Sequence, residues 1–141
     1  MANIVELREK SMEELLDMLE GAREELFNLR FQKAAGSLEN TGRLKVVRRN
    51  IAQLNEVIGK RKWAIEEAAK HDEVTAVLAD HTWVATASFV YEDGTWRVLF
   101  ADDNGRALAT VDVDLNKKRR RTRRQRADIA PVEKVVKVEV A

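Results

Sequence analysis

Residues 25–34 have the sequence ELFNLRFQKA and residues 44–54 the sequence LKVVRRNIAQL, and these two stretches predict the closed end of a helical hairpin. Between them lies Gly36, which can take the left-handed conformation that ends helices without a side-chain clash. Asn40 or Thr41 can cap a following helix with a side-chain oxygen. We therefore expect one helix to end near Gly36 and a second to begin just after Asn40 or Thr41.

Both expected helices carry an apolar stripe. Ser11 followed by Glu14 is a capping-box pattern, so the first long helix is expected to begin there. Its stripe recurs at three- and four-residue spacing and consists of Leu15, Leu19, Ala22, Leu26 and Leu29. The second stripe has a seven-residue repeat of Leu44, Ile51, Ile58 and Ile65, with Val47 and Leu54 between them. Facing stripes across a short loop predict an antiparallel coiled hairpin.

The first helix has more apolar surface than a two-helix hairpin can bury. Phe27 and Phe31 lie on a face away from the Leu15 to Leu29 stripe, at 100° per residue. A short amino-terminal helix with Ile4, Val5 and Leu7 is expected to fold back over part of that surface. A partner is the other candidate to cover it.

Charge is strongly polarised along the helical part. Residues 1–27 contain eight acidic and three basic residues, whereas residues 28–55 contain six basic residues and one acid. On the second helix Lys45, Arg48 and Arg49 lie roughly opposite the apolar stripe. This pattern is typical of a surface directed at a polyanion, although an ordinary solvated helix face remains the alternative.

After about residue 72 the pattern changes to that of a small β meander. Two runs rich in aromatic and β-branched residues, Thr82–Tyr91 and Thr95–Phe100, flank Asp93 and Gly94, a hairpin-turn signal. A third strand is expected from Arg106 to Val113. We expect the core of this sheet to contain Trp83, Phe89, Trp96 and Phe100.

The remainder opens with a basic run. Residues 117–126 have the sequence KKRRRTRRQR, in which eight of ten residues are basic. Such density favours an extended arm that binds nucleic acid, while a localisation signal and a solvated linker are the alternatives. Beyond Pro131, expected to mark a bend, Val136, Val138 and Val140 alternate with charged residues. This pattern predicts a strand that can join the meander.

Composition excludes several classes of protein. The 141 residues include no cysteine, which removes disulfide frameworks and thiol chemistry and favours a reducing compartment. No apolar run reaches the roughly 20 residues of a membrane span, and the start MANIVELR lacks a signal-peptide pattern, so we expect a cytoplasmic protein with no membrane partner. His71 and His81 have no evident catalytic partners, and Asp102, Asp103 and Asn104 suggest turn chemistry. We therefore expect no enzyme activity, metal or cofactor.

The helical part resembles the bacterial large-subunit ribosomal protein family numbered twenty-nine. The resemblance covers about residues 3–65. The residues that carry it are Glu6, Leu7 and Arg8, the Ser11 cap with Glu13, Glu14 and Leu15, the block Glu25 to Ala34 with Gly36, Leu38 and Asn40, and the segment Asn40 to Leu54. Residues 72–141 have no counterpart in the family.

The resemblance implies a three-helix structural protein bound to large-subunit rRNA beside the exit of the nascent-peptide tunnel. Implied neighbours are ribosomal protein twenty-three and the docking region for ribosome-associated chaperones and targeting factors. Implied RNA contacts are Asn28, Arg30, Gln32, Lys33, Arg43, Lys45, Arg48 and Arg49. We also expect contacts from Arg8 and from the basic run, namely Lys117, Lys118, Arg119, Arg120, Arg121, Arg123, Arg124 and Arg126.

The expected fold class is α+β. We predict three parts: a helical-hairpin domain at residues 1–71, a small β meander at 72–115, and a basic arm with a terminal strand at 116–141. A structural role in the large ribosomal subunit is the predicted function. The alternative is a coiled-coil adaptor or RNA-binding module outside the ribosome, which heptad spacing alone permits.

Overall fold

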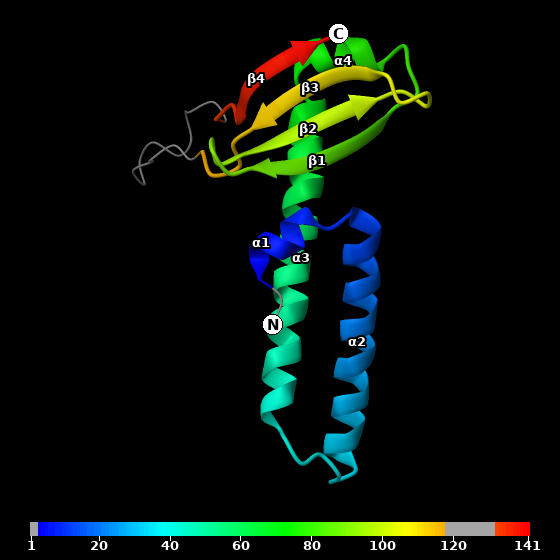
Figure 1. The fold of residues 1–141 in the computed structure, drawn as a ribbon, viewed down its shortest axis with the longest axis vertical. Helices are drawn as coiled ribbons and strands as arrows, with labels where there is room; N and C mark the ends of the chain where they lie inside the picture. Colours follow the sequence, from blue (N-terminus) through cyan, green and yellow to red (C-terminus); the bar gives the residue numbers. More distant parts are fainter. Residues whose placement is uncertain (1–2, 118–131) are drawn as a thin grey trace, which may run out of the picture. The chain divides into compact units, whose positions relative to one another are not determined.

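The computed structural model describes residues 3–117 and 132–141, which form four helices and four strands (Figure 1). The chain divides into two compact units, Met1–Lys60 and Arg61–Ala141. The boundary lies inside one long helix, α3, which spans Gly42–Ala69. The α+β fold class is confirmed. The three-part domain division at residues 71 and 115 stays a prediction.

The first unit is a helical hairpin preceded by a short helix. Its elements are α1 (Ile4–Glu9), α2 (Met12–Ala34) and the first part of α3, and α2 and α3 lie side by side as an antiparallel pair (Figure 1). The Ser11 hydroxyl accepts a hydrogen bond from the Glu14 N–H (3.1 Å), and the Ser11 N–H donates to the Glu14 carboxylate (2.8 Å). This capping box lowers the pKa of Glu14, because the backbone hydrogen bond favours the charged carboxylate.

The connection between the helices follows the predicted chemistry. α2 ends at Ala34, and Gly36 takes a positive φ of 73°. The Asn40 side-chain oxygen then accepts a hydrogen bond from the Gly42 N–H at 3.0 Å, where α3 begins. The expected stop at Gly36 is confirmed, and of the two cap candidates, Asn40 and Thr41, it is Asn40 whose side chain accepts this hydrogen bond.

The hairpin core is small. Its buried residues are Leu7, Leu15, Leu19, Leu54, Val57 and Ile58. α1 contributes Leu7, which is only 1% exposed, so α1 does fold back on the hairpin. It does not cover Phe27 and Phe31, which remain 69% and 70% exposed, so that expectation is wrong. The reason is reach: α1 joins the first turn of α2, whereas Phe27 lies about 20 Å further along the helix at 1.5 Å per residue.

The second unit contains a four-stranded antiparallel sheet of order β1-β2-β3-β4. The strands are β1 (Val84–Val90), β2 (Thr95–Ala101), β3 (Ala107–Val113) and β4 (Val135–Val140). Gly94 and Gly105 adopt positive φ in the two tight turns, and Asp102 accepts hydrogen bonds from the Asn104 and Arg106 N–H groups, both at 2.9 Å. The predicted meander, the added terminal strand and the turn role of Asp102 are confirmed.

One face of this sheet forms the larger core. Trp96, Val98, Phe100, Val111 and Val113 are buried there. They pack with side chains from two helical segments, namely Ala64 and Ala68 of α3 and Val74 and Leu78 of α4 (Asp72–Leu78).

Two expectations about these segments are wrong. The sequence reading places the start of the meander where α4 lies, because a seven-residue helix shows only one i, i+4 repeat, Val74 and Leu78. Ile65 was expected to face the first helix, but it packs against the sheet core, since the end of α3 belongs to the second unit.

Of the four aromatic residues predicted to form the sheet core, two are fully buried. Trp96 and Phe100 are 2% and 0% exposed, and Phe89 packs against the core while partly buried. Trp83 is 41% exposed, so its assignment to the core is wrong, although its ring contacts Phe100 edge to face at 5.3 Å. It directly precedes β1, an edge strand with one neighbour, which leaves less protein to cover it.

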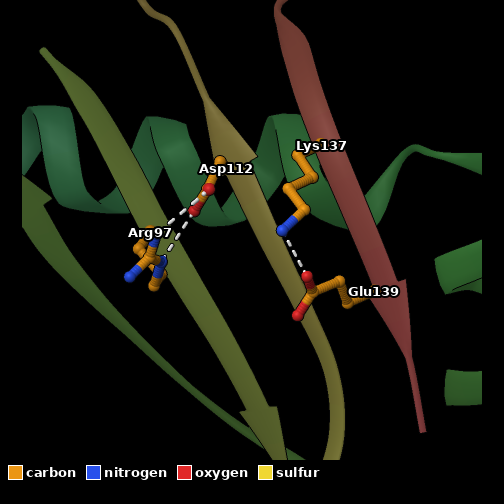
Figure 2. A network of polar contacts seen from close by, with 4 residues as sticks. All are labelled: Arg97, Asp112, Lys137 and Glu139. Atoms are coloured by element: carbon orange, nitrogen blue, oxygen red, sulfur yellow. Dashed lines mark hydrogen bonds and ion pairs between the residues drawn. The ribbon is translucent and has the colours of Figure 1, made fainter. Parts of the chain in front are cut away.

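The opposite face of the sheet carries paired charges. Figure 2 shows Arg97, Asp112, Lys137 and Glu139 projecting from three adjacent strands, with helix behind the sheet. The Arg97 guanidinium donates two hydrogen bonds to the Asp112 carboxylate, at 2.9 and 3.2 Å, and Lys137 forms an ion pair with Glu139. These contacts raise the pKa of Arg97 and of Lys137, because each carboxylate favours the charged partner. The face is thus largely neutralised by its own side chains.

Candidate nucleic-acid interface

Basic side chains converge at the closed end of the hairpin. Lys33 lies in the last turn of α2, whereas Lys45, Arg48 and Arg49 lie in the first two turns of α3. All four side chains are exposed. We call these four residues the basic tip.

The basic tip surrounds one hollow in the surface. The hollow is lined by Lys33, Thr41, Leu44, Lys45, Arg48, Arg49 and Ala52. The α3 residues reach it together because Lys45, Arg48, Arg49 and Ala52 follow i, i+3 and i+4 spacing on one helix face. Thr41, which was predicted only as a possible helix cap, adds a hydroxyl to this lining. A concave surface with four cations fits a phosphate-bearing backbone.

The cations of the basic tip are not neutralised by the protein. Within residues 3–117 and 132–141, no acidic side chain lies within 4.0 Å of the charged groups of Lys33, Lys45, Arg48 or Arg49. The same holds for Arg30 on α2. Their positive charge is therefore available to a partner.

Arg43 is different from these residues. Its guanidinium contacts Glu25 of α2, with both Nε and Nη2 at 2.7 Å from Oε1. This contact joins the start of α3 to α2. Arg43 therefore links the two helices of the hairpin, in addition to its predicted role in RNA binding. Because the Arg43 side chain is 58% exposed, an external phosphate can still reach it.

The remaining predicted residues of α2 lie on its exposed surface. Asn28, Arg30 and Gln32 are all solvent-exposed, close in sequence to the exposed rings of Phe27 and Phe31. Asn28 and Phe27 also line a second surface hollow, together with Leu16, Leu19, Glu20, Arg23 and Glu24. The α2 surface therefore combines amide groups, a cation and two aromatic rings next to the basic tip.

Arg8 lies apart from the basic tip. It is half-buried on α1, next to Leu7, which packs among Leu15, Val57 and Ile58 far from the hairpin loop. The structure therefore does not bring Arg8 together with Lys33, Lys45, Arg48 and Arg49.

The basic run begins at the end of the sheet. Lys117 is exposed, and Lys118, Arg119, Arg120, Arg121, Arg123, Arg124, Arg126 and Pro131 lie outside the described residues. The segments on either side of the run are held together: the Asp114 N–H donates to the Lys134 carbonyl at 2.8 Å, next to the Val113–Val135 pair. The described residues that flank the run, Asp114 and Lys134, are therefore held side by side.

The other candidate residues do not form a competing site. His71 occupies the N-cap position of α4 without a side-chain capping hydrogen bond, and its Nε2 lies 3.5 Å from the Glu133 carboxylate. Among the described residues, no three His, Cys, Asp or Glu side chains are grouped to hold a metal ion. In the same part of the chain, no helix has both the length and the apolar character that crossing a bilayer requires.

Comparison with known proteins gives the family of the hairpin. The model of the Ribosomal L29 protein family matches residues 5–61. The large ribosomal subunit protein uL29 of Streptomyces griseus is 57% identical over 61 residues, which is 43% of this chain and 82% of the relative. This chain belongs to the ribosomal L29 protein family. The uL29 protein of Rubrobacter xylanophilus is 58% identical over 57 residues, or 40% of this chain and 85% of the relative.

The family relationship confirms the resemblance inferred from the sequence. It covers the hairpin with the whole basic tip and ends at residue 61, so the matched region stops close to the boundary between the two compact units. No solved structure matches the chain.

Proposed function

We propose that this chain is a structural, non-catalytic component of the large ribosomal subunit and that it binds rRNA with its basic tip. The observation that carries this proposal is the gathering of Lys33, Lys45, Arg48 and Arg49 around one hollow without acidic partners. These residues all fall within the matched region, and the matched relatives are named as large-subunit proteins.

The chemistry of the surface suits folded RNA. A guanidinium pairs with phosphate through two parallel N–H groups, and lysine adds a flexible point charge. The amides of Asn28 and Gln32 can reach ribose hydroxyls and base edges, while Arg30 and Arg43 extend the cationic surface. Most of these contacts recognise the shape of the RNA backbone more than its sequence.

Protein neighbours on the subunit are part of the same proposal. The family resemblance favours a place beside the exit of the nascent-peptide tunnel in the cytoplasmic ribosome. There the neighbours would be ribosomal protein twenty-three and, at times, chaperones or targeting factors. The exposure of Phe27 and Phe31 supports the presence of a protein or RNA neighbour at this helix face. Without one, both apolar rings would remain exposed to solvent.

The basic run is proposed as a second RNA contact. Its predicted residues are Lys117, Lys118, Arg119, Arg120, Arg121, Arg123, Arg124 and Arg126, together with Arg8 on α1 as a minor contact. Support comes from the charge density of the run and from the anchoring of its flanks at Asp114 and Lys134. A density map of the subunit with this run free in solvent would count against this part.

A coiled-coil adaptor outside the ribosome is not favoured. An adaptor is expected to carry charges of both signs along the seam between its helices. Here the cations gather at one end of the hairpin and away from the buried stripe. The family relationship points the same way.

Charge reversal at the basic tip tests the RNA-binding proposal. The R48E/R49E variant should bind large-subunit rRNA fragments several kcal/mol more weakly, at about 1.5–3 kcal/mol per charge-assisted contact. The slope of log affinity against log salt should fall in magnitude by about 1.5, since two phosphate contacts are lost. Affinity is measured by fluorescence anisotropy over a salt series.

The matched control is R23E/K62E, which makes the same change in net charge at exposed positions outside the basic tip. It should retain most of the affinity. Incorporation into subunits is then compared in reconstitution assays. Equal incorporation of R48E/R49E and wild-type protein would remove the assignment of these residues.

A further inference from the structure

The outer edge of β1 lacks the usual protection of an edge strand. Natural proteins block exposed edges with charges, proline, bulges or a covering element, because unpaired backbone groups accept another strand. β1 is terminal in the sheet, and its register with β2 runs without a shift from Val84↔Ala101 to Val90↔Thr95. Among the described residues, no segment pairs with the other side of β1.

The sequence around β1 also lacks the charged residues that are frequent in the rest of the chain. The protein has 25 Lys and Arg and 24 Asp and Glu residues, yet residues 81–91 contain none of them and no proline. The opposite edge, β4, differs from β1 both in charge and in regularity. It carries Lys137 and Glu139, and its register with β3 shifts near Val113. One edge is therefore protected against further pairing and the other is open to it.

We propose that β1 is an interaction surface for a second copy of this chain, which pairs with it antiparallel about a two-fold axis at Ala87. This register places Val84 opposite Val90 of the partner copy and Thr86 opposite Ser88. On the other face it places the large Phe89 opposite the small Ala85, and Trp83 opposite Tyr91. The product is one continuous eight-stranded sheet, closed by symmetry.

The self-complementarity of this register supports the choice of a second copy. Large residues meet small ones, β-branched residues meet each other, and hydroxyls meet hydroxyls, which are the cross-strand pairs that stabilise sheets. Trp83 and Tyr91, which are 41% and 51% exposed in the single chain, each gain an aromatic neighbour. A shift of the register by one residue would lose the pairing of Phe89 with Ala85.

The inference is independent of the proposed rRNA binding. It uses residues 83–91 only, which lie beyond the region matched by the family model. Because the basic tip and β1 are formed by different residues, RNA binding and pairing through β1 are measured separately.

A charge-swap experiment on the full-length protein tests the register. The T86K/S88K variant and the T86E/S88E variant change side chains that are solvent-exposed in the single chain, so each should fold, as checked by circular dichroism. Each alone places like charges opposite each other twice and should dimerise at least about tenfold more weakly than wild type in sedimentation equilibrium. An equimolar mixture of the two variants should restore dimers, because opposite charges then meet.

Two controls complete the test. V136K places a charge on β4, the other edge, and should leave the dimer unchanged. Since the chain has no cysteine, A87C should form a disulfide-linked dimer under mild oxidation, because residues directly opposite in antiparallel strands have Cα atoms about 4.5–5.5 Å apart. S88C should not, since its partner in this register is Thr86.

The proposal is overturned if wild-type protein sediments as a monomer at 100-fold excess over the concentration used for rRNA binding, or if the variant mixture does not recover dimers. Open-ended aggregation of wild-type protein would overturn it as well, because a two-fold pair is closed. Loss of rRNA binding with intact dimers would instead refute the proposed function and leave this inference standing.

Discussion

Charged side chains of the sheet unit form ion pairs with one another, whereas the cations at the tip of the hairpin do not within the described part of the chain. On the sheet, Arg97 is matched to Asp112 and Lys137 to Glu139, so its charged face is complete without a partner. On the hairpin, the cations of the basic tip have no acidic neighbour among the described residues, and two phenylalanine rings stay in water. The hairpin, which has the smaller core, is thus the unit whose tip cations are not neutralised by the described residues of the protein itself. We infer that the hairpin gains much of its order from what it binds, whereas the sheet unit needs no partner to neutralise its charged face.

The largest expected effect separates the stabilities of the two units. F100A removes a side chain that is fully buried in the sheet core and should destabilise that unit by about 3–5 kcal/mol. Hydrogen exchange should show lost protection in β1 to β4 while α2 keeps its protection. L99A is the control, since Leu99 is 38% exposed on the other face and should cost much less. Equal loss of protection in α2 would mean that the units unfold as one.

A second substitution tests the dependence of the hairpin on its partner. L7A removes the buried contact of α1 and should cost about 2–3 kcal/mol, less than F100A because the removed side chain is smaller. Saturating rRNA should restore much of the lost helix, since a ligand that binds only the folded state stabilises it. V5A, at a 40% exposed position of the same helix, is the control. If rRNA gives L7A no thermal stabilisation, the link between binding and order is refuted.

A third substitution asks whether Glu25 competes with RNA for Arg43. E25Q removes an exposed ion pair and should lower hairpin stability by only about 0.2–1 kcal/mol. The affinity for rRNA should nevertheless rise, because Arg43 no longer has a carboxylate partner. E24Q makes the same change in charge on the same helix without this contact. Equal gains for both variants would show that net charge alone is responsible.

The smallest expected effect concerns pH. The folded-state pKa of Glu14 lies below its ordinary value of 4.5, because Ser11 donates to the carboxylate. Its stabilising contribution is therefore complete above about pH 4.5 and is lost as the pH falls through the lower folded-state pKa. The helical signal should be slightly more acid-sensitive in wild-type protein than in E14Q, in which the amide oxygen still accepts a hydrogen bond. Identical pH profiles by circular dichroism would contradict this role.

Sequence reasoning was most successful where local chemistry determines the backbone. Ser11 with Glu14, Gly36 with Asn40, and the turns at Gly94 and Gly105 are each specified by neighbouring residues, and all were predicted. The shared face of Lys45, Arg48 and Arg49 followed from helical spacing, because the side chains of one helix face have fixed directions, whereas Lys33 was expected from the family resemblance.

Features that depend on distant parts of the chain were missed. The seven residues of α4 show too little periodicity to identify a helix until the sheet that buries Val74 and Leu78 is known. The contact of Arg43 with Glu25 depends on how far α2 extends past the start of α3, which no spacing rule gives. The exposure of Trp83 depends on its place beside an edge strand, which only the sheet order reveals.

The continuity of α3 limits how this protein can be divided or recombined. The sheet requires Ala64 and Ala68 from the same helix that completes the hairpin, so a fragment that starts at residue 72 would leave its hydrophobic face open to water. A chimera that adds the sheet to a shorter relative must bring the carboxyl-terminal turns of this helix as well. The last turns of α3 and the strands thus share one core, and a transplant of the strands alone would not fold.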